Sequence, residues 1–373
     1  MTSMVPVSIA SPVQPYSNLS SVKQLAESPG LNSIPSCYEY SNNHTDDQST
    51  ASDDPDEVSI PVIDFSLLSS TNLDQRLKVV QELGRACQEW GFFMVVNHGI
   101  PETLMKAIFD VSDEFFNLPE EEKIGYETKH VLDPIRCGTS FNASKEQIFF
   151  WRDFLKVFVH PEFHCPHNPK VFSDLLMDYV KRTRQMGRKL IGGISQSLGL
   201  EEDYIEKLLD LESGLLIFAA NYYPPCPQPK LAMGMPPHSD HSLLTLLLQN
   251  GVGGLQIQHK GKWVNVNALP NSFLVNTGDH LEILSNGKYK SVLHRAAVNS
   301  EMKRISIAVT NGPSLDTNVG PASPLLTDDH GNEIPALYTP MTYREYLELQ
   351  QVNKLDGKSC LDRVKIVPPT PST

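Results

Sequence analysis

Seven short runs of β-branched and aliphatic residues follow one another between residues 215 and 310, with turn residues between them. Short strands at this spacing are typical of a sandwich or barrel, and the jelly roll is one such fold. We therefore predict a β core over residues 215–320. The predicted strands are Leu215–Tyr223, Leu243–Leu248, Gly254–His259, Trp263–Val266, Ser272–Thr277, Val292–Val298 and Ile305–Thr310.

Helical periodicity marks the region before this core. Apolar residues recur at helical spacing over Leu73–Trp90, and further helices are predicted over Pro101–Phe116 and about Val171–Leu198. The run Phe92–Val96 is typical of a buried strand. We predict an α+β fold in which a helical region, residues 58–214, packs on the β core. A C-terminal helix and tail follow at residues 321–373.

Residues 1–57 are rich in Ser, Asn, Asp and Pro, and we predict a leader that is mostly disordered because little of it can be buried. The first 26 residues contain no acid and no Arg and only one Lys, so a plastid transit peptide is less favoured than a cytoplasmic protein. A nuclear pool would also fit this composition. The six cysteines form no CxxC pair, which predicts free thiols.

The net charge of −13 disfavours binding to nucleic acid or to anionic membranes, and no apolar run approaches the roughly 20 residues of a membrane helix. The acidic composition therefore favours a small molecule as the binding partner. We expect a monomer by default.

Three residues are candidate metal ligands. The pair His238-Ser-Asp240 precedes a predicted strand, and its i, i+2 spacing on extended chain puts both side chains on one face. His294 interrupts another strand and can supply a third ligand. A His-x-Asp motif alone does not indicate a metal site, since His44-Thr-Asp46 in the leader matches it too. Two imidazoles and one carboxylate on a β scaffold are typical of non-haem Fe(II) sites.

Other roles for these residues stay open at this point. The histidines could be loop and strand-end residues, or the three ligands could hold zinc in a hydrolase with Glu282 as its base. His280 is predicted to be a solvent-facing loop residue.

Arg304 and Ser306 share one face of a predicted strand whose other positions are apolar. Burial of an arginine side chain inside a barrel costs free energy unless an anion pairs with it. The anion could be an internal carboxylate. It could also be a bound dicarboxylate that pairs with Arg304 and accepts a hydrogen bond from Ser306, and position and residue type favour this second reading.

These residues lie in motifs that resemble the plant 2-oxoglutarate/Fe(II)-dependent dioxygenase family, in its flavanone 3-dioxygenase-like and salicylate-hydroxylating branches. Motifs of this kind are found in the N-terminal half of the chain as well as in the β core. The motifs are Ile60-Pro-Val-Ile-Asp64, Trp90–Gly99, Asn221-Tyr-Tyr-Pro-Pro-Cys-Pro227, Pro237-His-Ser-Asp240, Gly254-Leu-Gln256, Gly278–Arg295 and Arg304-Ile-Ser306.

The resemblance implies a double-stranded β-helix, or jelly roll, with iron bound by His238, Asp240 and His294 and no catalytic residue beyond these ligands. It implies Fe(II), 2-oxoglutarate and O₂ as cofactor and cosubstrates, with ascorbate as reductant. The implied contacts for 2-oxoglutarate are Arg304, Ser306 and the hydroxyl of Tyr223, with Asn221 in support.

The implied activity is hydroxylation of a small plant metabolite, such as a phenolic or a hormone, with release of succinate and CO₂. O-demethylation or desaturation on the same scaffold, and a non-catalytic small-molecule-binding protein, are the alternatives. We predict substrate contacts at Phe141, Phe154, Phe158 and Thr310. Flavonoid synthases of the family carry Phe at the position of Thr310, which disfavours a flavonoid substrate.

Overall fold

The computed structural model describes residues 21–40, 60–128, 130–140, 148–328, 330–352 and 357–366. Its strands are β1 (Val62–Asp64), β2 (Phe92–Val96), β3 (Ile135–Thr139), β4 (Asp153–His160), β5 (Leu216–Tyr223), β6 (Met235–His238), β7 (Leu244–Gln249), β8 (Leu255–His259), β9 (Lys262–Asn265), β10 (Phe273–Thr277), β11 (His294–Ala296), β12 (Arg304–Asn311), β13 (Asn318–Val319) and β14 (Met341–Thr342). Its α-helices are α1 (Val22–Ala26), α2 (Leu73–Glu89), α3 (Glu102–Phe116), α4 (Glu120–Lys123), α5 (Phe172–Ser197), α6 (Tyr204–Leu208), α7 (Asp279–Leu284), α8 (Tyr343–Val352) and α9 (Ser359–Val364).

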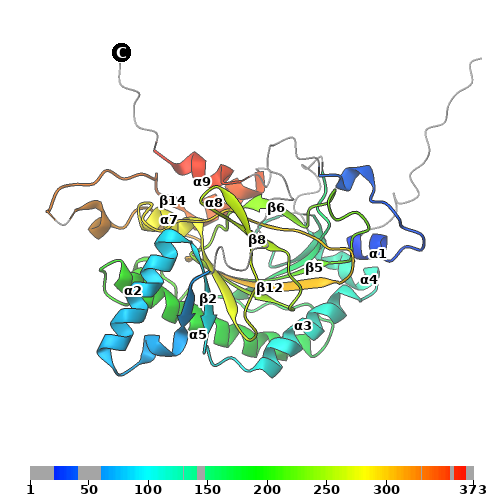
Figure 1. Ribbon diagram of the computed structural model, residues 1–373, viewed down its shortest axis with the longest axis horizontal. Helices are drawn as coiled ribbons and strands as arrows, with labels where there is room; N and C mark the ends of the chain where they lie inside the picture. The colour runs from blue at the N-terminus through cyan, green and yellow to red at the C-terminus, as the bar shows by residue number, and fades with distance from the viewer. Residues whose placement is uncertain are drawn as a thin grey trace, which may run out of the picture.

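Two sheets form the core of the molecule. Eight strands pair in the order β1-β2-β10-β7-β12-β5-β4-β3, and four pair in the order β6-β11-β8-β9 (Figure 1). Strands distant in the sequence are neighbours in both sheets, and nearly all pairs are antiparallel. The predicted jelly roll is confirmed, and each of the seven predicted core strands is present.

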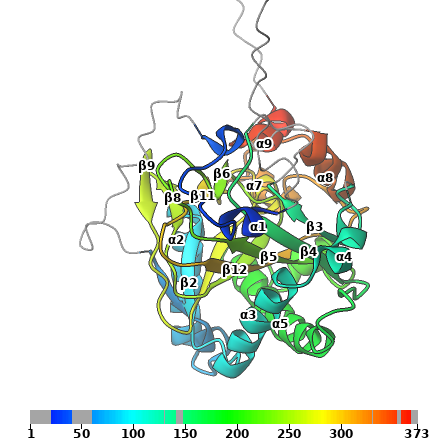
Figure 2. The ribbon, with the colours of Figure 1, turned by 90° about the vertical axis from the view of Figure 1, so that its right-hand side faces the viewer.

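The long helices cover one face of the larger sheet. Figures 1 and 2 show α3 and α5 packed below β5 and β12, on the side away from the smaller sheet. Leu83 of α2, Ile108 of α3 and Leu190 of α5 are fully buried in one cluster with Phe218 and Leu246 of the sheet. The three predicted helices agree with the structure to within one residue at each end. The smaller sheet, and the space between the two sheets, lie on the opposite face of the larger sheet.

Strands β3, β4 and β6 are among the elements that were not predicted. Strand β6 contains Pro236 and Pro237, which are poor strand residues, yet β6 is an edge of the smaller sheet, where a missing N–H donor is tolerated. Strands β3 and β4 extend the larger sheet beyond β5, and β4 carries charged residues at Asp153 and Lys156. Their strand conformation depends on pairing with β5, which lies some 60 residues further along the chain.

Part of the predicted leader is folded. The backbone N–H groups of Val22 and Lys23 donate to the carboxylate of Asp153 over 2.9 and 2.8 Å, and Val22 is fully buried. Tyr38 packs edge-on against Trp151. Residues 21–40 are thus anchored to the edge of the larger sheet, whereas residues 1–20 and 41–57 lie outside the described residues.

The described helices include none with both the length and the apolar composition needed to cross a bilayer. All six cysteines are free thiols, as predicted.

Candidate metal centre

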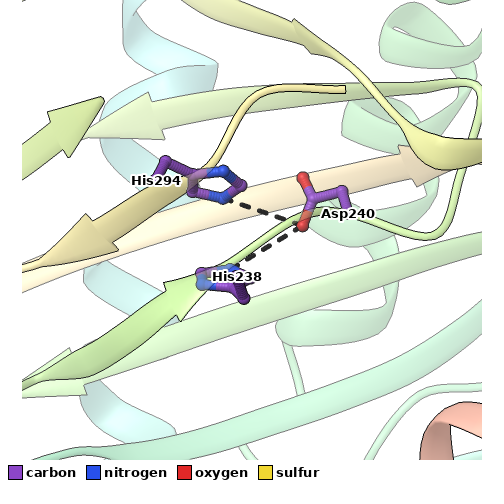
Figure 3. A group of neighbouring side chains, drawn as sticks. All are labelled: His238, Asp240 and His294. Atoms are coloured by element: carbon purple, nitrogen blue, oxygen red, sulfur yellow. Dashed lines mark ion pairs between the residues drawn. The ribbon is translucent and has the colours of Figure 1, made fainter. Parts of the chain in front are cut away.

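His238, Asp240 and His294 meet at one point between the two sheets (Figure 3). The Nε2 atom of each histidine lies 3.8 Å from Oδ1 of Asp240, and one ligand atom from each residue lies within 4.8 Å of the others. His238 ends β6 and His294 begins β11, and the two are direct partners across these antiparallel strands. The three predicted ligands are therefore brought together.

The route by which Asp240 reaches the site differs from the prediction. His238 and Asp240 do not open the strand that follows them. Instead His238 is the last residue of β6, and Asp240 lies in the turn that leads toward β7. The prediction identified the right residues but assigned both to the beginning of β7. It missed β6 because this strand contains two prolines, which are rare in strands.

Hydrogen bonds set the tautomer of both imidazoles. Nδ1 of His238 lies 2.8 Å from the carbonyl oxygen of Pro236, and Nδ1 of His294 lies 3.2 Å from that of Val292. A carbonyl only accepts, so each Nδ1 carries the proton and donates it. The Nε2 lone pairs then point toward Asp240, as metal binding requires.

The charges of the group suit a cation. Burial, and then the neighbouring His294, lower the pKa of His238 to about 3, so this imidazole is neutral at physiological pH. Burial alone would raise the pKa of Asp240, but the two histidines and hydrogen bonds from Thr245 and Asn276 hold it below its ordinary value. A neutral imidazole and an ionised carboxylate are the protonation states that bind a divalent metal.

Asn276 of β10 orients the carboxylate ligand. Its Nδ2 donates to Oδ2 of Asp240 over 2.8 Å, which leaves Oδ1 for the metal, and the side chain is only 2% exposed. Loss of such a partner weakens metal binding by about 10- to 100-fold. We expect Asn276→Ala to raise the Kd for Fe(II) by that factor in an anaerobic titration, with turnover largely restored at excess iron. The exposed Asn267→Ala is the control, and an unchanged Kd in Asn276→Ala would refute this role.

Arg304 supplies a buried cation beside the metal ligands. Its side chain is 2% exposed, and Nη2 donates to Oε1 of Gln249 over 2.6 Å. Nε and Nη1 are buried without a hydrogen-bond partner. Among the described residues no carboxylate lies within 4.0 Å of the guanidinium, so an internal ion pair does not explain its burial. The two unpaired N–H groups fit an external carboxylate.

The predicted 2-oxoglutarate contacts line up across two strands. Arg304 is the register partner of Tyr223, and Ser306 is the partner of Asn221. The Arg304 guanidinium lies over the Tyr223 ring, 4.9 Å from its centroid, and Asn221 Nδ2 lies 3.4 Å from Ser306 Oγ. Arg152 donates to Asn221 Oδ1 over 3.1 Å and holds the amide in that orientation.

A single cavity of about 120 Å³ joins the two groups. The three candidate ligands and the four predicted 2-oxoglutarate contacts all line it. The donor set fits ferrous iron, and the unpaired guanidinium fits a dicarboxylate. The predicted metal ligands and the predicted 2-oxoglutarate contacts thus line one cavity.

Of the predicted substrate contacts that the structure describes, one lines the cavity and two do not. Thr310 lines the cavity, but Phe154 and Phe158 do not. Both lie on the same face of β4 as Lys156, which does line it, so neighbouring packing and not strand alternation keeps them from the cavity. Phe154 lies beneath the Arg152 guanidinium at 5.2 Å, and Phe158 packs in a separate cluster beside Tyr343 and Leu347. Phe141 lies outside the described residues.

Several lining residues escaped the prediction, among them Arg152, Lys156, His241 and Gln350. Lys156 interrupts an apolar run between Leu155 and Val157, and this pattern could have marked it as a lining residue. The prediction for His280 was wrong. It is fully buried in α7, and its Nδ1 bonds to the backbone oxygen of His241.

Glu282 does not serve as a base at the metal. Its carboxylate accepts hydrogen bonds from the Ser291 N–H, the Tyr338 hydroxyl and the Lys358 ammonium at 2.7 to 3.0 Å. It is 3% exposed and does not line the cavity. The arrangement thus offers no support for the zinc hydrolase.

Known proteins resemble the chain over most of its length. Residues 215–313 match the 2OG-Fe(II) oxygenase superfamily, and residues 60–174 match the family described as non-haem dioxygenase in morphine synthesis N-terminal. The 2-oxoglutarate-dependent dioxygenase 19 of Oryza sativa subsp. japonica is 45% identical over 309 residues, which cover 83% of this chain and 90% of that protein. Flavanone 3-dioxygenase 2 of the same organism is 41% identical over 82% of this chain and 87% of its own length.

The fold agrees with a solved structure. A crystal structure of JOX2 in complex with 2OG, Fe and JA superposes with a TM-score of 0.82 at 31% identity, and it covers 94% of this chain and 98% of the other. The helical region and the β core are therefore both shared, not the core alone.

Proposed function

The chain belongs to the 2-oxoglutarate/Fe(II)-dependent dioxygenase family and is itself an enzyme of that type; we propose that it hydroxylates a small plant metabolite at the centre just described. His238, Asp240 and His294 bind the ferrous ion in this proposal. The observation that supports it is the shared cavity, in which the three candidate ligands lie together with a buried guanidinium that has no carboxylate partner among the described residues.

When bound, Fe(II) and 2-oxoglutarate supply the oxidative chemistry, in which O₂ is consumed and succinate, CO₂ and oxidised substrate are released. The protein contributes geometry. His238 of β6, His294 of β11 and Asp240 would hold the ion, and a ligand set of this kind would leave other metal positions for cosubstrate and substrate.

The cosubstrate end of the cavity is built to hold a carboxylate. Arg304 offers two N–H donors, and Ser306 and Tyr223 offer hydroxyl groups beside it. Asn221, held by Arg152, orients the Ser306 hydroxyl. These groups would donate hydrogen bonds to the carboxylate of 2-oxoglutarate that does not reach the metal, and would thereby orient the cosubstrate.

The substrate end is apolar near the metal. The buried Phe92 and Leu255 and the partly buried Leu247 line it, and these apolar side chains would disfavour water at the oxidation site. No protein base is required there, because a hydrogen atom and not a proton leaves the substrate. O-demethylation and desaturation use the same groups, and the product formed distinguishes them from hydroxylation.

Coupled turnover tests this function. Purified enzyme with Fe(II), 2-oxoglutarate and ascorbate would be supplied with ¹⁸O₂ and a panel of plant phenolics and hormones. We expect one panel member to disappear with an equal amount of succinate and with ¹⁸O in the product. Binding of panel members without succinate release would instead indicate a non-catalytic binding protein. Tight zinc with 2-oxoglutarate-independent hydrolysis would indicate a metallohydrolase.

A further inference from the structure

Asp240 is the one candidate ligand that lies outside a strand. His238 ends β6 and His294 begins β11, and pairing between these strands holds both histidine backbones. Asp240 lies in the connection between β6 and β7. Connecting segments are more mobile than the strands they join, so a ligand on one of them stays in place only if neighbouring elements hold it. The contacts of this connection therefore decide where the carboxylate lies.

The first turn of α7 packs directly against the backbone of the connection. The N–H of Asp279 donates to the carbonyl oxygen of Asp240 over 2.7 Å. A Cβ atom at Gly278 would lie 2.0 Å from the carbonyl oxygen of Ser242, so only glycine permits this close approach. The main chain at the carboxylate ligand is thus held by α7, and the position of α7 matters for the metal centre.

Two tyrosines of α8 hold the side chains on either side of the carboxylate ligand. The hydroxyl of Tyr343 lies 2.7 Å from Nδ1 of His241. The hydroxyl of Tyr346 donates to Oδ2 of Asp279 over 2.7 Å. The hydroxyl of Ser239 donates to the same oxygen over 3.2 Å. The residue before the ligand and the residue after it are therefore both connected to α8, which lies about a hundred residues further along the chain.

These contacts are buried and closely packed. Tyr343 and Tyr346 are both 0% exposed, and Asp279 is 2% exposed. The ring of His280 contacts both tyrosine rings edge-on, with centroid distances of 4.8 and 4.7 Å. Hydrogen bonds in such an environment are stronger than in water, and the packed rings leave the hydroxyl groups little freedom to move. The tyrosines can therefore fix the position of their partners.

The helix that carries the tyrosines is itself anchored on the larger sheet. Tyr343 and Leu347 pack in one buried cluster with Leu215 and Ile217 at the start of β5. Strand β5 also carries Tyr223, one of the predicted 2-oxoglutarate contacts. Helix α8 thus connects the segment of the carboxylate ligand to the strand that supports the cosubstrate end of the cavity.

We propose that Tyr343 and Tyr346 are positioning residues for iron binding, which hold the connection that carries Asp240. Tyr343 acts through His241, and Tyr346 acts through Asp279. This inference rests on the proposed function, since it concerns the metal of the same centre. The C-terminal helix then contributes to iron affinity, although neither tyrosine is a candidate ligand.

The first test measures iron affinity. Tyr343→Phe and Tyr346→Phe each remove one hydroxyl group and keep the ring. We expect each to raise the Kd for Fe(II) in an anaerobic titration by about three- to tenfold, and the double variant to raise it by about 10- to 100-fold, since partners of metal ligands have effects of this order. Wild-type affinity in the double variant would overturn the inference.

A matched control separates positioning from a general loss of stability. Tyr289 is 1% exposed, and its hydroxyl lies 2.8 Å from Oγ of Ser197. Tyr289→Phe therefore also loses a buried hydroxyl contact, but on the helical side of the molecule. It should lower Tm by a similar amount and leave the Kd for Fe(II) within twofold of wild type. If Tyr289→Phe raises this Kd as much as the α8 variants do, the effect is structural and the inference fails.

The second test examines the route and the coordination geometry. If Tyr343 acts through His241, adding Tyr343→Phe to a His241→Leu protein should change the Kd for Fe(II) by less than twofold. An undiminished effect would overturn this route. The visible absorption of the Co(II)-loaded protein reports the arrangement of the ligands. It should change in Tyr343→Phe and Tyr346→Phe and stay the same in Tyr289→Phe, and identical spectra in all variants would count against positioning.

The two proposals fail differently. If the wild-type protein does not bind Fe(II), the proposed function fails. If it binds Fe(II) and the Tyr343→Phe and Tyr346→Phe variants bind it equally well, only the role of α8 fails.

Discussion

Replacing Asp240 with alanine is expected to lower turnover by at least about 10³-fold while the fold is retained. The change removes the one carboxylate ligand and leaves two imidazoles, whose affinity for Fe(II) is much lower. Loss of the metal removes several kcal/mol of transition-state stabilisation, and each 1.36 kcal/mol corresponds to a factor of ten in rate. His238→Ala should have an effect of the same order.

The fold should survive, because the Asp240 side chain faces the cavity and its neighbours there, Asn276 and the two histidines, can take up water in its place. Succinate formation, bound iron per chain and the circular dichroism spectrum are the measurements. Asp110→Ala, on the exposed side of α3, is the control. Substantial turnover by a folded Asp240→Ala protein would refute the assignment of the metal centre.

Arg304→Lys is expected to raise the KM for 2-oxoglutarate by about 10- to 100-fold. Lysine keeps the charge but offers a single point of contact where the guanidinium offers a fork. The lost charge-assisted bond is worth about 1.5–3 kcal/mol, and each 1.4 kcal/mol corresponds to a tenfold change in affinity. The shorter donor also leaves Gln249 Oε1 without its present partner.

The measurement is the KM for 2-oxoglutarate at saturating iron and substrate, together with the Kd for Fe(II) in the absence of 2-oxoglutarate. We expect the first to rise and the second to stay the same. Arg85→Lys on the exposed face of α2 is the control. If the KM for 2-oxoglutarate stays at its wild-type value, Arg304 does not hold the cosubstrate.

The β core and its candidate ligands could be predicted because the signals are local. Strand residues alternate between faces, so a polar residue inside an apolar run is marked by its immediate neighbours. His294, Arg304 and Ser306 were identified in this way, and the structure places all three on the cavity wall. The family motifs then connected them with Asn221 and Tyr223, which are the register partners of Ser306 and Arg304.

The remaining errors concern pairing between distant segments. β6 forms in spite of two prolines because it lies at a sheet edge, and α1 is held by Asp153, which is 130 residues away. His280 of α7 is buried where its ring contacts Tyr343 and Tyr346 of α8. Neither neighbour is near it in the sequence.

By itself, then, the sequence determined which side chains carry the chemistry, because side-chain type and strand alternation are properties of a few consecutive residues. The tertiary structure alone decided what those side chains face. The order β12-β5-β4 brings Lys156 of β4 to the same cavity as Leu247 of β7. Phe154 and Phe158 share a strand face with Lys156, yet packing against Arg152 and beside Tyr343 keeps them out of the cavity wall. Sheet register and order are set by the packing of the whole core, so no short segment of the chain encodes them.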